Sequence, residues 1–222
     1  MSNFFSWSWH RCALRPITVL ATALVCAVTA AAAAAPTILI VGDSISAGYG
    51  LPPDAGWTTL LQRRLAEQHY PHRVVNASIS GDTTASGRTR LAMLLAQQRP
   101  VITVIELGGN DGLRGGSLEA MRANLDAMVA AAQKAGSRVL VVGMQLPPNY
   151  GPAYVRQFDA TYGEVATARH AALVPFLFEG FGDDDALFQP DRIHPVMAAQ
   201  PKLLDNVWRE LKPLLDAPGK AP

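Results

Sequence analysis

The sequence predicts an α/β protein, a three-layer α/β/α sandwich with a central parallel sheet. Short apolar runs rich in β-branched residues recur along the chain, as is typical of strands buried on both faces. These runs alternate with segments whose apolar residues repeat every three or four positions, which indicates amphipathic helices. Polar segments rich in glycine follow several of the strands. Such alternation builds a parallel sheet between helices, with sites at the carboxyl ends of its strands.

A leader precedes the first predicted strand. Arg11 and Arg15 stand before an apolar, alanine-rich run over 17–35, which ends in several A-x-A sites before Pro36. This pattern indicates a secretory signal peptide over residues 1–35, cleaved near 33–35, and so a periplasmic or secreted protein. An uncleaved membrane anchor is the alternative for a run of this length, but we expect no stable membrane insertion after cleavage.

The mature chain is expected to form one domain over 36–215, followed by a disordered tail over 216–222. Both cysteines, Cys12 and Cys26, lie in the leader, so the domain needs neither a disulfide nor a thiol. Without Arg11 and Arg15, 17 of the 19 basic residues remain against 18 acidic ones. This balance gives no indication of nucleic-acid binding. Nothing in the sequence demands association, and we expect a monomer.

The elements follow in a regular order. Strands are expected at 37–42, 73–76, 101–107, 138–143 and 172–175. Between them, three helical faces are marked by Trp57, Leu60, Leu61 and Leu65; by Leu91, Leu94 and Leu95; and by Leu118, Met121, Leu125 and Met128. Pro195 suits the first position of a last helix, which would hold the preceding residue at a rigid junction.

The first strand ends in the segment Gly42-Asp-Ser-Ile-Ser-Ala-Gly-Tyr-Gly50, where the chain turns sharply towards a helix. A serine in such a turn, here Ser44, can present its hydroxyl above the sheet edge beside backbone N–H groups. A hydroxyl is nearly inert at neutral pH unless an imidazole accepts its proton. The segment Asp191-Arg-Ile-His-Pro195 provides His194 as that base and Asp191, three residues earlier, to orient it.

Two further polar segments follow the second and third strands, Asn76-Ala-Ser-Ile-Ser-Gly-Asp-Thr83 and Glu106-Leu-Gly-Gly-Asn-Asp-Gly112. Together with the serine and histidine segments, they resemble the four sequence blocks of the GDSL or SGNH hydrolases, over nearly the whole mature region. The resemblance implies the flavodoxin-like fold of that family and a cofactor-free, metal-free ester hydrolase. It implies Ser44 as nucleophile and an oxyanion hole formed by the Ser44 and Gly81 N–H groups and the Asn110 amide.

The same resemblance implies that the Gly112–Gly115 segment and the proline-stiffened 144–152 loop shape an acyl pocket. Leu113, Leu146, Pro147 and Tyr150 are the expected acyl contacts, with ordinary loop packing as the alternative. The expected substrates are small acyl esters, acyl thioesters or lysophospholipids with short to medium chains. Arg192 departs from the family pattern: it places a large side chain between Asp191 and Ile193, where a small residue would intrude less.

Each assignment has a simpler alternative. Gly81 could serve only a turn before a helix starting at Thr83, Asn110 could serve only turn chemistry, and Asp191 with His194 could form a helix cap beside a surface histidine. Asp43 and Asp111 are expected to organise backbone N–H groups around the site. The alternative functions are a carbohydrate deacetylase of the same family, a metal-dependent phosphoesterase using Asp43, Asp111, Asp191 and His194, and a non-catalytic binding protein.

Overall fold

A five-stranded parallel sheet lies at the centre of the protein, with its strands in the order β2-β1-β3-β4-β5. The strands are β1 (Thr37–Gly42), β2 (Arg73–Asn76), β3 (Ile102–Glu106), β4 (Arg138–Val142) and β5 (Ala172–Val174). This order is that of the flavodoxin-like folds, in which the order reverses between β1 and β3. Functional groups that follow these two strands therefore meet at the switch point.

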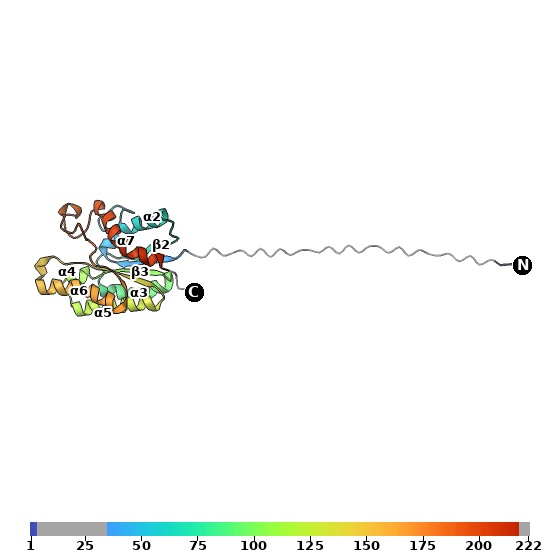
Figure 1. The fold of residues 1–222 in the computed structure, drawn as a ribbon, viewed down its shortest axis with the longest axis horizontal. Helices are drawn as coiled ribbons and strands as arrows, with labels where there is room; N and C mark the ends of the chain where they lie inside the picture. The colour runs from blue at the N-terminus through green and yellow to red at the C-terminus, as the bar shows by residue number, and fades with distance from the viewer. Residues whose placement is uncertain (4–34, 218–222) are drawn as a thin grey trace. The chain divides into compact units, whose positions relative to one another are not determined.

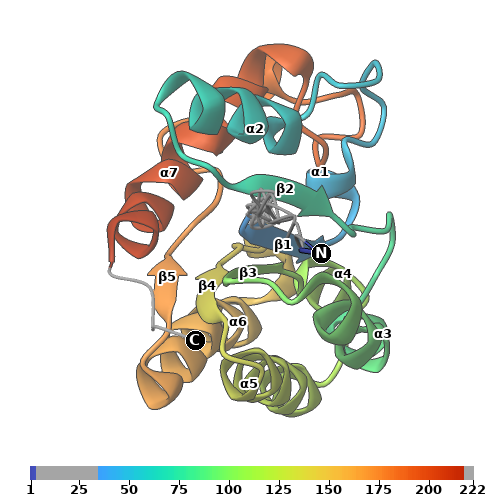
Figure 2. The same ribbon diagram turned by 90° about the vertical axis from the view of Figure 1, so that its right-hand side faces the viewer.

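Helices cover both faces of the sheet, which confirms the predicted three-layer architecture (Figures 1 and 2). One face carries α2 (Trp57–Glu67) and α7 (Gln200–Asp216). The other carries α3 (Thr84–Gln98), α5 (Leu118–Lys134) and α6 (Pro152–Arg169). Five short helical turns complete the fold: α1 (Ser44–Ala47), α4 (Gly109–Leu113), η1 (Pro148–Tyr150), η2 (Asp185–Leu187) and η3 (Met197–Ala199).

The strands are apolar at successive positions because each face of the sheet has its own core. Ile38 and Ile40 of β1 pack in the core beneath α2 and α7, whereas Leu39 and Val41 pack in the core beneath α3, α5 and α6. All four side chains are fully buried. Full burial of an aliphatic side chain of this size stabilises a protein by roughly 1.5–3 kcal/mol, so β1 holds the two helical layers to one sheet.

The computed structural model describes residues 1–3 and 35–217. All the helices and strands named above lie in one compact unit, residues 34–222. The predicted signal peptide, apart from its two ends, and residues 218–222 of the predicted tail lie outside the described residues. Within the described ranges, no helix combines the length and the apolar character needed to cross a membrane.

One expectation about the C-terminal part is wrong in detail. Pro195 does not begin a helix, because it pairs with Phe188 in an isolated antiparallel bridge, and α7 begins only at Gln200. The rigid junction at His194 is therefore a bridged loop. The helix α7 ends at Asp216, whose carboxylate accepts hydrogen bonds from Tyr70 and Lys212.

Candidate active site

The segment after β1 forms a tight turn that places Ser44 at the first position of α1. Asp43 caps this helix, since its Oδ1 accepts a hydrogen bond from the Ile45 N–H at 3.0 Å. The turn packs so closely on β3 that a Cβ at Gly42 would lie 2.6 Å from Glu106 Oε2 and 2.8 Å from Ser46 Cβ. Glycine at position 42 is therefore a steric requirement of the turn that carries the serine.

The side chains of Ser44, His194 and Asp191 form one continuous chain of hydrogen bonds. His194 Nε2 lies 2.8 Å from Ser44 Oγ, and His194 Nδ1 lies 2.7 Å from Asp191 Oδ2. The contact joins residues 150 positions apart in the sequence. With Nδ1 protonated towards the carboxylate, Nε2 is free to accept the hydroxyl proton.

Backbone hydrogen bonds fix the loop that carries the imidazole. The Gln189 N–H donates to the His194 carbonyl at 2.7 Å, beside the bridge between Phe188 and Pro195. Asp191 Oδ1 accepts the N–H groups of Ile193 and His194 at 2.9 and 3.0 Å. Desolvation raises the pKa of Asp191, but the hydrogen bonds from His194 and Ile193 outweigh it and lower the pKa to about 2. This carboxyl group is therefore ionised at neutral pH.

The Asn110 side chain links the two loops that flank Ser44. Its Nδ2 donates to Asp43 Oδ2 at 3.1 Å and to the Asp82 carbonyl at 3.0 Å. Asp43 precedes Ser44, and Asp82 follows Gly81, so the amide lies between the two segments that carry the expected N–H donors. Gly81 is exposed and adopts φ +84°, which glycine tolerates without strain.

Arg90, on α3, links the segment that precedes Ser44 to the segment that carries Gly81, and it was not predicted from the sequence. Its guanidinium pairs with Asp82 at 2.7 Å and donates to the carbonyls of Gly42 and Ala77. Both partners of this ion pair are largely buried. One side chain thereby ties the end of β1 to the loop after β2, beside Gly81.

Two buried carboxyl groups lie under the serine turn. Glu106, at the end of β3, is fully buried, and its Oε2 accepts hydrogen bonds from Ser46 Oγ at 2.7 Å and from the Asp43 N–H at 3.3 Å. Desolvation, together with the nearby Asp43 carboxylate, raises the pKa of Glu106 well above its usual range. Desolvation also raises the pKa of Asp43, to about 6. At neutral pH, therefore, Asp43, both of whose oxygens accept hydrogen bonds, carries the negative charge, and Glu106 is protonated.

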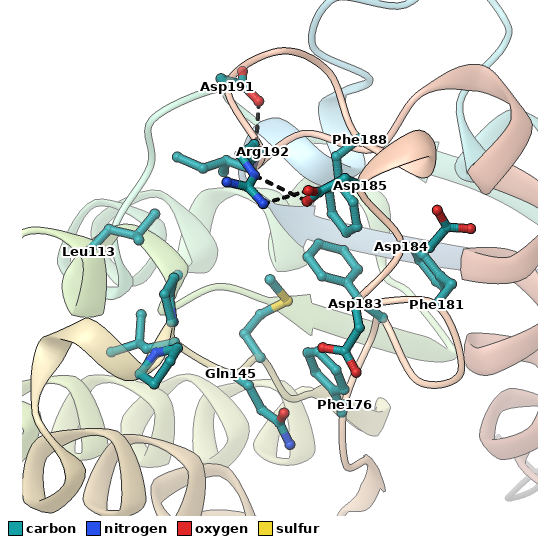
Figure 3. Close-up of a pocket in the computed structure, with 18 of the residues that line it drawn as sticks. Leu113, Gln145, Phe176, Phe181, Asp183, Asp184, Asp185, Phe188, Asp191 and Arg192 are labelled. Atoms are coloured by element: carbon teal, nitrogen blue, oxygen red, sulfur yellow. Dashed lines mark hydrogen bonds and ion pairs between the residues drawn. The ribbon is translucent and has the colours of Figure 1, made fainter.

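A cavity of about 1310 Å³ adjoins the triad through Asp191 and Ile193. Figure 3 shows Leu113 on one side of it and Phe176 and Phe188 on the other. All four expected acyl contacts line this cavity: Leu113, Leu146, Pro147 and Tyr150. The Tyr150 hydroxyl also donates to the Leu113 carbonyl at 3.0 Å, which joins the two loops of this wall.

The opposite wall comes from the segment between β5 and the triad loop, which the sequence analysis did not identify. It contributes an aromatic group, Phe176, Phe178, Phe181 and Phe188, whose rings contact one another. Arg192 lies at the rim, where its guanidinium forms a two-point ion pair with Asp185 (Figure 3). The aromatic residues have no regular spacing, so only their density near the Asp-His segment was available as a signal.

The remaining polar candidates have other partners. Asp111 accepts both the N–H and the hydroxyl of Thr84, at 2.9 and 2.6 Å, and Asp43 caps α1, so both organise N–H groups as predicted. In the described ranges, no cluster of three or more His, Cys, Asp or Glu could hold a metal ion. Of the other histidines, His69 and His170 are exposed and His72 is half-buried.

A flavodoxin-like α/β/α fold with a hydroxyl, an imidazole and a carboxylate in line at its switch point defines the class of the serine ester hydrolases. Within that class the chain belongs to the GDSL-like lipase/acylhydrolase family, whose sequence profile matches residues 40–200.

Three relatives illustrate this membership. The chain is 56% identical over 183 residues to the esterase TesA of Pseudomonas aeruginosa, which covers 82% of this chain and 91% of TesA. It is 40% identical to thioesterase 1/protease 1/lysophospholipase L1 of Escherichia coli K12, over 83% of this chain and 88% of that protein. The crystal structure of the psychrotrophic esterase EstA from Pseudoalteromonas sp. superposes with a TM-score of 0.77 at 38% identity, covering 81% of this chain and 98% of EstA.

Proposed function

We propose that this protein hydrolyses carboxylic esters and acyl thioesters through an acyl-serine intermediate on Ser44. The hydrogen-bonded line from Asp191 through His194 to Ser44 carries the proposal. In acylation, Ser44 Oγ bonds to the acyl carbon and its proton passes to His194 Nε2. That proton then goes to the departing oxygen or sulfur as its bond to the acyl carbon breaks. A water molecule then attacks the acyl carbon while His194 Nε2 accepts its proton. His194 returns a proton to Ser44 Oγ as the bond between Oγ and the acyl carbon breaks, and the carboxylic acid is released.

The negative charge on the acyl oxygen is received by the N–H groups of Ser44 and Gly81 and by the Asn110 amide. Two observations support this assignment. The Asn110 amide contacts the neighbours of both Ser44 and Gly81, and Arg90 ties the same two segments together. Because the Asn110 amide already donates to Asp43 and Asp82, it must share or exchange a hydrogen bond when the oxyanion forms.

The acyl chain occupies the cavity between Leu113 and the phenylalanine wall. Both walls of the cavity contribute apolar side chains, and its volume admits short to medium acyl chains. The relatives are named esterase and thioesterase 1/protease 1/lysophospholipase L1, which supports small-molecule acyl esters and thioesters as the substrate class. The leader over 1–35 supports export to the periplasm or the medium.

A labelling experiment tests the reaction class. A fluorophosphonate probe should modify Ser44 of the intact protein, identified by peptide mass, and should abolish hydrolysis of p-nitrophenyl butanoate. Ser44→Ala should lose both labelling and turnover, while treatment with EDTA should leave the wild-type rate unchanged. Persistent turnover in Ser44→Ala, or loss of turnover with EDTA, contradicts the proposal and revives the phosphoesterase alternative. A panel of acyl-chain lengths with an acetylated sugar separates an esterase from a carbohydrate deacetylase.

A further inference from the structure

An aromatic side chain covers part of the triad imidazole. The ring centroids of Tyr49 and His194 lie 4.5 Å apart with a tilt of 41° between the ring planes. Despite this contact, Tyr49 is 53% exposed. The ring therefore presents apolar surface to solvent directly at the reacting groups.

Tyr49 is held in this place by the same residue that holds the triad loop. Gln189 Nε2 donates to the Tyr49 carbonyl at 2.8 Å, while the Gln189 N–H donates to the His194 carbonyl at 2.7 Å. Gln189 thus fixes the backbone of Tyr49 relative to that of His194. The backbone from which the ring projects is therefore fixed relative to the imidazole.

The chemistry places the leaving group against this ring. To be protonated, the departing atom must approach within about 3 Å of His194 Nε2. Tyr49 contacts the imidazole that bears this nitrogen, so substituents on the departing atom come within van der Waals reach of the phenol ring. Tyr49 does not line the large cavity assigned to the acyl chain. The two parts of the substrate therefore meet different surfaces.

We propose that Tyr49 forms a leaving-group subsite that selects flat, aromatic leaving groups over small alkyl ones. This inference rests on the proposed acyl-serine reaction. Stacking against an aromatic ring contributes roughly 0.5–1.5 kcal/mol beyond the area buried, which corresponds to about 2- to 12-fold in rate. An alkyl leaving group such as ethoxide offers no ring to stack and gains little from Tyr49.

The test compares phenyl butanoate with ethyl butanoate, which share one acyl group and differ only in the leaving group. The quantity measured is kcat/KM, because it reports the acylation step in which the leaving group departs. Tyr49→Ala should lower kcat/KM for the phenyl ester about 2- to 12-fold more than for the ethyl ester. Tyr49→Phe should keep the wild-type ratio of the two esters, since it retains the ring.

Two further variants make the result decisive. Tyr49→Leu keeps apolar bulk without a ring and should lose the aryl preference even if the alanine variant folds poorly. Met93→Ala removes an equally exposed apolar side chain from α3, at 56% exposure, and should change neither rate. An equal loss on both esters would show that Tyr49 only supports His194, and would overturn the subsite. Failure of the reaction class itself would be visible separately, as turnover in Ser44→Ala.

Discussion

Replacing Asp43 with asparagine should change how the stability of the fold depends on pH. Asp43 is 3% exposed, and desolvation raises its pKa from the ordinary 3.8 to about 6. The folded state therefore holds this proton more tightly than the unfolded chain does. The stabilisation from the neutral carboxyl group is complete below pH 3.8 and is lost as the pH rises through 6. An asparagine at this position does not titrate.

The size of the effect follows from the two pKa values. A difference of about 2 pKa units corresponds to about 3 kcal/mol over the full titration, of which about 2 kcal/mol falls between pH 4 and pH 7. The variant also loses an acceptor for the Asn110 amide, but its amide oxygen can still cap α1. Losing this hydrogen bond shifts the free energy of unfolding of Asp43→Asn by the same amount at every pH. The change of that free energy with pH is therefore the informative quantity.

The assay is urea unfolding followed by tryptophan fluorescence at several pH values between 4 and 7, with Trp57 as a fully buried reporter. The free energy of unfolding of the wild type minus that of Asp43→Asn should fall by about 2 kcal/mol across this range. Subtraction removes the contributions of carboxyl groups that are not coupled to Asp43, such as Asp191 with its lowered pKa. A difference that stays flat, or that increases with pH, would refute an elevated pKa at Asp43.

Substitutions at three other positions probe the same region. Asn110→Ala should lower kcat on p-nitrophenyl esters by about two to three orders of magnitude without changing the preference for acyl-chain length. A smaller loss of kcat would show that the Asn110 amide does not belong to the oxyanion hole. Glu106→Gln replaces the carboxyl group with a neutral group of the same shape and should keep the wild-type free energy of unfolding in urea at pH 7. Glu106→Ala should lower that free energy by about 1–3 kcal/mol, because Ser46 Oγ and the Asp43 N–H lose their acceptor. Gly42→Ala should lower both melting temperature and kcat, because its Cβ meets Glu106 Oε2; a variant as stable and active as wild type contradicts this packing.

The sheet and the chemistry of the site could be predicted from the sequence because each depends on local patterns. The apolar runs over 37–42 and 138–143 have no polar alternation, which leaves burial on both faces as the consistent interpretation. Parallel strands then bring the segments after β1 and β3 to one edge, so the sequence alone predicts that Ser44 and Asn110 lie close together. The Asp191-to-His194 spacing similarly fits a single turn of chain.

The features missed by the sequence analysis depend on distant partners. Arg90 stands on a helix like any solvated arginine, and only the fold places it against Asp82 and the carbonyl of Gly42. Pro195 fits a helix start by its own preference, yet its bridge to Phe188 overrides that preference. The phenylalanine wall is likewise formed by tertiary packing, since its residues follow no strand or helix period.

The distance along the chain between Ser44 and His194 also determines when the protein can act. During synthesis the nucleophile emerges early, and its base is made only when translation is almost finished. The loop that carries the imidazole lies between β5 and α7 in the chain, so its contact with Ser44 joins the first strand to the last part of the domain. Ester hydrolysis therefore requires both ends of the domain to be folded against each other, and regain of turnover reports on that assembly.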